Sequence, residues 1–128
     1  MKTNGTIQPI TLPKPVFEGC TTVFEALKMR RTSRTMRDEK IPLQILSDIL
    51  WAAIGVNRKK GPFGDRGRTA GSASNAREIL VFVALQEGTF YYEPDAHRLL
   101  PAASGDLRKF AIGRGQQATL ADAPVQLI

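Results

Sequence analysis

The chain has one cysteine and one histidine in 128 residues, and this scarcity excludes several kinds of site. A single cysteine, Cys20, cannot form a disulfide within the chain, which fits a reducing compartment. Cys20 and His97 together are too few for the usual zinc ligand sets. His97 would also have to serve any Ser-His or Cys-His catalytic pair. Because no partner stands at a telling spacing, we interpret His97 as a surface histidine.

Long hydrophobic runs are also missing, so the sequence predicts neither a membrane span nor a secretory signal. No stretch approaches the roughly 20 apolar residues that a span needs, and residues 1–10 contain no apolar segment of the signal type. Hydrophobic residues make up 42% and charged residues 23%, as in ordinary globular proteins. We expect a soluble cytoplasmic protein with one domain over residues 1–128, in which residues 1–20 form an extended lead-in.

Positive charge is abundant and unevenly placed. The net charge is +6, and residues 1–77 hold fourteen Lys and Arg against six Asp and Glu. The densest part is Arg30-Arg31-Thr32-Ser33-Arg34, which combines three guanidiniums with two hydroxyls. An Arg side chain can bind a phosphate with two parallel hydrogen bonds. The pattern leaves three interpretations open: a cofactor phosphate, the phosphates of a nucleic acid, or a solvated basic face without function.

Two helices are predicted in the first half of the chain. Thr22 and Glu25 form a capping box, so a helix should begin at Thr22, with Phe24 and Leu27 toward the core. It ends near Arg30 and Arg31, where the helix dipole favours cations in any case. A second helix should start after Pro42 and stop at Gly55. Its apolar stripe has helical spacing and comprises Leu46, Ile49, Leu50, Ala53 and Ile54. Trp51 lies off this stripe, so we expect it to pack on a second surface.

The second half of the chain is predicted to be mainly strands. Residues 79–85 are an apolar run that indicates a central strand buried on both faces. A turn at residues 87–88 should lead into a returning strand at 89–92, and another short strand is expected around 98–100. A helical stretch is expected at 107–112 or 116–122, and residues 125–128 resemble the start of a further strand. Residues 57–75 show no apolar period and are predicted to be loop.

The loop at residues 68–75 has the composition of a ligand-binding segment. Its small residues would let a flat ligand approach the backbone, and Asn75 offers both a donor and an acceptor. An ordinary turn or helix start explains the same composition. Neither a Walker sequence nor GxGxxG before a helix is present, so no nucleotide-binding fingerprint applies.

Taken together, the two segments resemble the nitroreductase family of flavoproteins. Arg30-Arg31-Thr32-Ser33-Arg34 is similar to the family's Arg-Arg-Ser-x-Arg, and residues 71–78 (Gly-Ser-Ala-Ser-Asn-Ala-Arg-Glu) are similar to its Pro-Ser-Ser/Ala-x-Asn-x-Gln-Pro/Glu. Residues 46–53, 57–58, 68–70 and 88–97 resemble a subgroup related to SagB-type dehydrogenases. The resemblance covers about residues 12–128.

This resemblance implies an α+β fold in which helices surround a mostly antiparallel sheet. It implies FMN bound in a groove at a homodimer interface, with NAD(P)H as reductant and a small organic molecule as hydride acceptor. By position, Arg30, Arg31, Thr32 and Arg34 would bind the phosphate, the ribityl chain or the polar edge of the flavin. Ser72, Ala73 and Asn75 would line the flavin ring. Arg77 stands where the family has Gln and would donate hydrogen bonds to the flavin with an added charge.

Other features depart from the family. Gly71 replaces the usual Pro, and family domains continue well past Ile128, so we expect a chain truncated at its C-terminus that binds FMN weakly or not at all. An inactive fragment without cofactor therefore stays open. So does a small basic nucleic-acid-binding domain that uses Lys28, Arg30, Arg31, Arg34, Arg37, Lys59 and Lys60. The aromatic residues at 90–92 do not alternate with these basic residues, which counts against nucleic acid as a partner.

Overall fold

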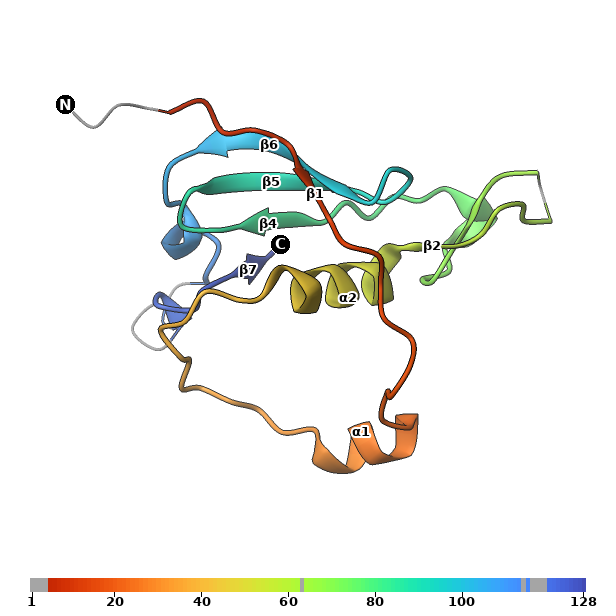
Figure 1. Cartoon of the computed structure of the whole chain (residues 1–128), viewed down its shortest axis with the longest axis horizontal. Helices are drawn as coiled ribbons and strands as arrows, with labels where there is room; N and C mark the ends of the chain where they lie inside the picture. Colours follow the sequence, from red (N-terminus) through yellow and green to blue (C-terminus); the bar gives the residue numbers. More distant parts are fainter. Residues whose placement is uncertain (1–4, 63, 114, 116–119) are drawn as a thin grey trace.

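A five-stranded antiparallel sheet with one helix packed across it forms the body of the molecule (Figure 1). The computed structural model describes residues 5–62, 64–113, 115 and 120–128. The sheet has the strand order β1-β6-β5-β4-β7, and every neighbouring pair is antiparallel. Its strands are β1 (Ile10–Thr11), β4 (Phe82–Ala84), β5 (Gly88–Glu93), β6 (Arg98–Ser104) and β7 (Gln126–Leu127). The other elements are α1 (Val23–Met29), α2 (Leu43–Ile54), a β2–β3 pair (Val56–Arg58, Gly67–Arg68) and the 3-10 turns η1 (Ala73–Asn75) and η2 (Arg108–Phe110). This is the α+β architecture expected from the sequence.

The core lies between α2 and one face of the sheet. Along β5, Phe90 and Tyr92 are buried while the residues between them are half-buried, which is the two-residue period of a strand with one covered face. Leu46 and Leu50 of α2 pack into the same cluster. The other face of the sheet is less covered, and there Phe82 contacts Tyr91 with ring centroids 5.8 Å apart. β5 is therefore fully buried on one face only, whereas Val83 and Ala84, which follow each other in β4, are both 0% exposed, as expected for a strand buried on both faces.

Most of the predicted strands are confirmed, but the run at 79–85 is wrong in length. Only Phe82–Ala84 form β4, and Ile79 and Leu80 are 72% and 54% exposed. The β4–β5 and β5–β6 hairpins and the terminal strand β7 are present as expected. η2 is a single 3-10 turn in place of the helical stretch expected at 107–112, while the alternative at 116–122 includes residues outside the described part.

Helix α2 ends where the sequence predicts, for a steric reason. Gly55 follows the last helical residue, and a Cβ at this position would lie 2.6 Å from Cγ of Trp51. Trp51 packs edge-on against Phe17 of the lead-in, with ring centroids 4.7 Å apart. The expectation that Trp51 packs on a second surface is confirmed. Of the predicted apolar stripe, however, only Leu46 and Leu50 are buried.

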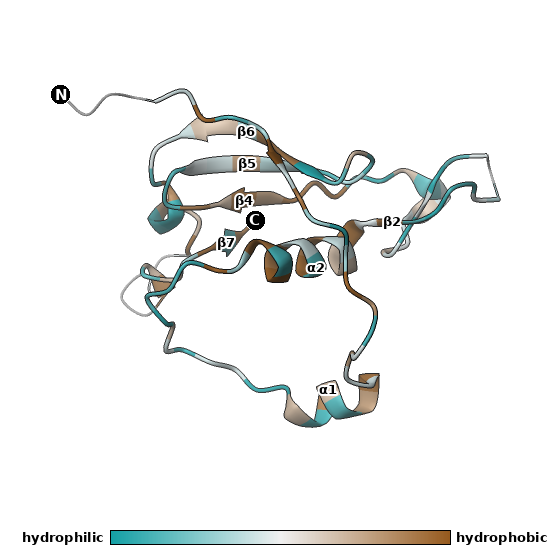
Figure 2. Ribbon diagram, in the orientation of Figure 1, coloured by the Kyte–Doolittle hydropathy of each residue, from teal (hydrophilic) through white to brown (hydrophobic). Residues whose placement is uncertain are grey.

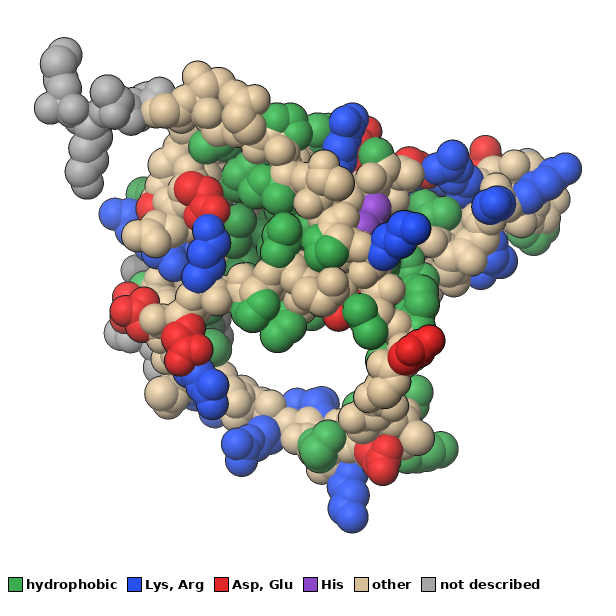
Figure 3. Space-filling model, in the orientation of Figure 1, with side chains coloured by type: hydrophobic (Ala, Val, Ile, Leu, Met, Phe, Trp, Pro, Cys, Tyr) green, Lys and Arg blue, Asp and Glu red, His purple; other side chains and the backbone are tan. Residues whose placement is uncertain are grey.

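Helix α1 stands away from the sheet on two extended segments, and we call residues 14–40 the α1 arm (Figure 1). Its predicted capping box is confirmed: Thr22 Oγ1 accepts from Glu25 N at 3.3 Å, and Thr22 N donates to a Glu25 carboxylate oxygen at 3.0 Å. The prediction that Phe24 and Leu27 face the core is wrong, because they are 85% and 61% exposed. The apolar ribbon of α1 is remote from the core in Figure 2, and Figure 3 shows an opening between arm and body.

The two ends of the α1 arm are fastened differently. On the N-terminal side, Val16 N donates to Asp48 Oδ1 at 3.0 Å and Gln44 Nε2 donates to the Lys14 carbonyl at 2.9 Å. Asp48 and Gln44, the partners of these two hydrogen bonds, both belong to α2. On the C-terminal side, Lys40 pairs with Glu87 at 3.2 Å through a side chain that is 80% exposed. Exposed ion pairs contribute little free energy, so the N-terminal attachment is the firmer one.

Candidate functional site

The segment after α1 places a row of cationic side chains in solvent. Arg30 caps the helix with extended backbone (φ −60°, ψ 125°), so the helical hydrogen bonds stop there. Residues 30–34 are all exposed. Among the described residues, no carboxylate forms an ion pair with Arg30, Arg31 or Arg34. Their guanidinium N–H groups are therefore available to an anion.

The second predicted segment, residues 72–77, is a tight loop that we call the Asn75 loop. It contains the 3-10 turn η1, and Asn75 N donates to the Ser72 carbonyl at 3.1 Å. The Arg77 backbone N–H donates to Ser72 Oγ at 3.1 Å, and Arg77 Nε donates to Asn75 Oδ1 at 3.4 Å. These bonds use the Asn75 oxygen as acceptor and leave its amide N–H₂ as the donor on this side chain. The Asn75 loop therefore gathers Ser72, Asn75 and Arg77 at one place.

Backbone strain is concentrated in the Asn75 loop. Ser74, Asn75 and Arg77 have φ values of +51°, +55° and +55°. Asn adopts this left-handed region more readily than other residues with a side chain, whereas Ser and Arg do so at a cost of about 1 kcal/mol each. Strain of this kind persists where the surrounding contacts hold the backbone in place. Here those contacts include Arg77 Nη2, which donates to the Arg66 carbonyl at 2.6 Å.

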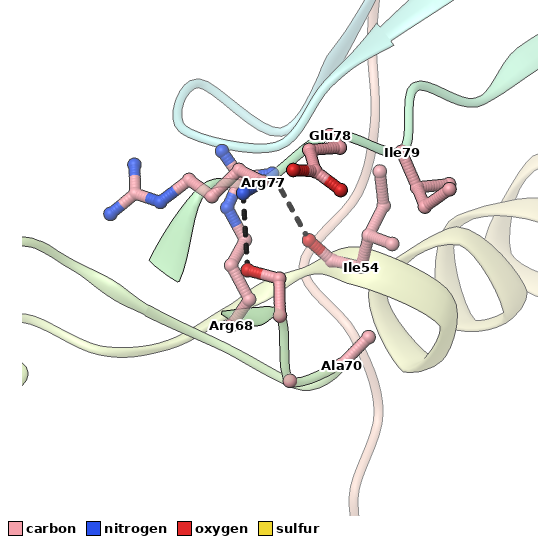
Figure 4. A pocket seen from close by; sticks show the side chains of 8 residues that line it. Ile54, Arg68, Ala70, Arg77, Glu78 and Ile79 are labelled. Carbon is pink, nitrogen blue, oxygen red and sulfur yellow. Dashed lines mark hydrogen bonds between the residues drawn. The ribbon is translucent and has the colours of Figure 1, made fainter. Parts of the chain in front are cut away.

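A small pocket lies between the Asn75 loop and the C-terminal end of α2 (Figure 4). Arg68 crosses its floor: Nη1 donates to the Ile54 carbonyl at 3.4 Å, and Nη2 pairs with Asp95 at 3.1 Å. The Nε–H of Arg68 is buried and has no acceptor among the described residues. The lining also includes the apolar side chain of Ile79, the Ser72 hydroxyl and the Glu78 carboxylate, and the volume is only about 50 Å³. Ligand pockets usually exceed about 300 Å³, so this pocket alone does not enclose a flat heterocycle.

Within one chain, the two predicted segments do not meet. Figure 1 places the segment after α1 at the lower left of the view and the Asn75 loop at the right. Segments that are well apart in a projection are at least as far apart in space. The pockets at the Asn75 loop are lined by residues 54–79 and include none of residues 30–34. One chain therefore contributes two candidate half-sites that face different surroundings.

A second cleft, which the sequence did not predict, lies beside the Asn75 loop and shares Arg68 and Ser72 with the first pocket. It separates this loop from the β2–β3 pair and is lined by Arg58, Arg66 and Arg68 together with Ser72, Ser74 and Asn75. The region was expected to be loop because two- and three-residue strands carry no readable period. The available signal was the density of basic residues among glycines between 58 and 68.

His97 is not the surface histidine that the sequence suggested. It is half-buried, with hydrogen-bond distances to Ser47 Oγ and Tyr92 Oη of 2.7 and 2.8 Å. Burial raises the pKa of Tyr92 to about 12, and the positive charge of Arg68 opposes that shift. Ser47 is completely buried and so is closed to any substrate. This cluster therefore holds segments together and offers no accessible nucleophile.

Two further expectations concern what the chain does not contain. In the described ranges, no group of three or more His, Cys, Asp or Glu side chains is placed to hold a metal ion. No helix within these ranges has the length and apolarity needed to cross a membrane.

Comparison with known proteins gives one family. The family model described as "Nitroreductase family" matches residues 27–128. The crystal structure of a "putative nitroreductase" from Ralstonia eutropha JMP134 superposes with a TM-score of 0.78 and is 35% identical in sequence. The match covers 94% of this chain and 54% of that one, so the chain spans about half the length of this relative. No curated protein sequence matches significantly.

Proposed function

Because this chain belongs to the nitroreductase family, we propose that it binds FMN and acts as an oxidoreductase. Bound FMN would supply the hydride chemistry, taking a hydride from NAD(P)H at N5 and passing it to an organic acceptor such as a nitroaromatic or a quinone. The chain's own residues would bind and orient the cofactor. The single observation that carries the proposal is the pair of donor-rich segments, one after α1 and one at the Asn75 loop, in the order and positions of the family's motifs.

The segment after α1 fits the phosphate end of the cofactor. Arg30, Arg31 and Arg34 lie on extended, exposed backbone, and no described carboxylate neutralises them. Thr32 adds a hydroxyl donor between them. A dianionic phosphate would accept charge-assisted hydrogen bonds from these groups, which are about twice as strong as neutral ones.

The Asn75 loop fits the isoalloxazine ring of the cofactor. Ser72 and Ala73 are small enough to let an isoalloxazine approach the backbone, and the Asn75 amide is free to donate. The Arg77 guanidinium is held by Asn75 and by the Arg66 carbonyl, so it is a fixed cation beside the ring. Exposed Ile79 and Leu80 follow at once and would exclude water from one side of the site.

The separation of the two half-sites supports a homodimer with FMN at the interface. The arginines of one subunit and the Asn75 loop of the other would enclose one cofactor, and a pair of identical sites would result. α1 carries exposed Val23, Phe24, Leu27 and Met29, apolar surface that a monomer would leave in water. We further propose that the protein is cytoplasmic and belongs with the SagB-type dehydrogenases, on the motifs at residues 46–53, 57–58, 68–70 and 88–97.

The test is the absorbance spectrum of the purified protein, alone and after FMN is added, followed by gel filtration. Flavin bands should elute with the protein at the position of a dimer. Arg31→Gln should weaken FMN binding roughly tenfold or more, because it removes a charge-assisted hydrogen bond, and Asn75→Ala should weaken it less, because it removes a neutral amide donor. Lys14→Gln removes the same charge as Arg31→Gln from outside both segments and should leave FMN binding unchanged.

A colourless protein that binds DNA with a steep dependence on salt would overturn this proposal and favour the nucleic-acid-binding alternative. The assignment of Arg31 to the FMN phosphate would also be overturned if Lys14→Gln weakened flavin binding as much as Arg31→Gln does. The loss would then come from the net charge of the protein and not from a specific contact.

A further inference from the structure

The described residues that line the cleft between the β2–β3 pair and the Asn75 loop include three arginines and no carboxylate. Arg58 and Arg66 come from the hairpin arms, and Arg68 follows at the end of β3. The facing wall consists of the Ser72 and Ser74 hydroxyls and the Asn75 amide. We call this the arginine cleft. Its lining holds far more hydrogen-bond donors than acceptors, and donors select for anions.

Two of the three arginines share one counter-ion. Asp95, in the turn between β5 and β6, lies 3.1 Å from Arg68 and 3.6 Å from Arg66. The Arg68 side chain is only 14% exposed, so this guanidinium is fixed in position. A single carboxylate against two guanidiniums leaves a net positive charge on the floor of the arginine cleft.

Arg58 is the third cation and has no described ionic partner. Its guanidinium lies across the backbone of Gly67, where a Cβ would come within 2.6 Å of Arg58 Cζ. The close approach is possible because residue 67 has no side chain. Arg58 therefore lies exposed against Gly67 at the arginine cleft, and no described carboxylate neutralises its charge.

We propose that the arginine cleft binds the oxyanion, a phosphate or a carboxylate, of the small molecule that reacts at the flavin, with Arg58 as the main contact. The proposal rests on the proposed function, because Ser72 and Asn75 line both the arginine cleft and the proposed flavin site. An anion bound here lies next to the cofactor ring. Arg58 is thus a specificity-determining residue that favours anionic over neutral substrates of the same shape.

Three variants isolate this role. Arg58→Gln removes the unpaired charge. Lys59→Gln removes the same charge from the neighbouring residue, which does not line the arginine cleft. Gly67→Ala keeps every charge but displaces the Arg58 guanidinium, since the added methyl would overlap a flexible side chain and not the backbone. Circular dichroism and gel filtration check that each variant keeps its fold and assembly.

The first measurement is binding of inorganic phosphate by isothermal titration at fixed ionic strength, which requires no turnover. Arg58→Gln should weaken binding about tenfold or more. Gly67→Ala should weaken it in the same direction, and Lys59→Gln should match the unaltered protein. Equal losses in Arg58→Gln and Lys59→Gln would overturn the arginine cleft as a site.

The second measurement separates the two sources of the oxyanion by steady-state kinetics. If the anion is the 2′-phosphate of the reductant, Arg58→Gln raises the KM for NADPH about tenfold and leaves the KM for NADH unchanged. If it is a carboxylate of the acceptor, the same variant raises the KM for 4-nitrobenzoate but not for its neutral methyl ester. In either case the readout is the ratio of the two KM values, compared between Arg58→Gln and the unaltered protein.

The outcomes distinguish this proposal from the proposed function. The protein could bind phosphate through Arg58 and yet show no flavin activity. That result would overturn the proposed oxidoreductase function and leave the arginine cleft as an anion site. The protein could instead be an active flavoenzyme in which Arg58→Gln leaves the KM values of all four substrates unchanged. That result would overturn the role of the arginine cleft but not the proposed function.

Discussion

His97 Nε2 lies 2.7 Å from the Ser47 hydroxyl oxygen and 3.0 Å from the carbonyl oxygen of Pro13. Ser47 in turn donates to the same carbonyl at 2.6 Å. A carbonyl oxygen only accepts hydrogen bonds, so the proton of the neutral imidazole belongs on Nε2. Nδ1 is then the acceptor for the Tyr92 O–H at 2.8 Å. The three side chains join the lead-in, α2 and β5 through one satisfied network.

We expect His97→Ala to destabilise the fold by about 2 kcal/mol, because it leaves the buried Tyr92 hydroxyl without an acceptor. Ser47→Ala should cost about 1 kcal/mol, since Pro13 can still accept from His97. The double variant should show a coupling energy of about 1 kcal/mol in urea unfolding. Strict additivity of the two single changes would contradict the network.

The raised pKa of Tyr92 predicts a loss of stability in alkali. Below pH 10 the phenol is neutral in both states, so its contribution is fully present. As the pH rises from 10 to about 12, the unfolded chain ionises first and the free energy of unfolding falls. The difference between a pKa of 10.0 in the unfolded chain and about 12 in the folded protein corresponds to a loss of about 2–3 kcal/mol in the free energy of unfolding. Unfolding curves at pH 9 and pH 12 should show this loss in the unaltered protein and in Tyr91→Phe, the control, but not in Tyr92→Phe.

Gly55 and Gly71 should respond in opposite ways to the same substitution. Gly55→Ala drives a methyl into the ring and carbonyl of Trp51 and should cost about 1–3 kcal/mol, the usual range for overpacking. A Cβ at Gly71 meets nothing within 4 Å. Gly71→Ala should therefore be neutral, or stabilise by up to about 1 kcal/mol through the unfolded state. Thermal melts of both variants compare them directly, and equal destabilisation would be inconsistent with the described packing.

The capping box should control α1 and nothing else. Thr22→Ala removes the hydroxyl that accepts from Glu25 N and donates to the Glu25 carboxylate, so amide hydrogens of residues 25–29 should exchange faster with solvent. Those of β5 should be unaffected, because α1 packs on no part of the core. The same hydrogen bonds from Thr22 lower the pKa of Glu25. Protection of α1 should then be lost as the pH falls through that lowered pKa, and a loss that also reached β5 would contradict this independence.

Local signals in the sequence were enough to place α2, the capping box and the β4–β5 hairpin. Leu46 and Leu50 follow a helical period, and residues 87–88 interrupt two runs of strand-forming residues. These patterns depend on neighbours a few positions away. β1 could not be found this way, because Ile10 and Thr11 are strand only through pairing with Leu99 and Arg98.

The sequence was less informative about what covers each surface. Phe24 and Leu27 have the spacing of a buried face, yet a period states only that a face is apolar and not which element meets it. The prediction for His97 was wrong for a related reason: two of its three partners, Ser47 and Pro13, are 50 and 84 residues away in the chain. The motifs located the candidate site residues, whereas the arginine cleft depends on Arg58 crossing a glycine nine positions away.

The fastening of the α1 arm has a mechanical consequence. Hydrogen bonds to α2 hold its N-terminal side, while an exposed ion pair holds the C-terminal side at Lys40. The two attachments should respond differently to salt, because screening weakens an exposed ion pair. Raising the ionic strength would weaken the pair between Lys40 and Glu87 while the hydrogen bonds to α2 remain. Residues 30–34 lie between the two attachments. Their position would then depend on the ion pair between Lys40 and Glu87, a contact that none of them makes.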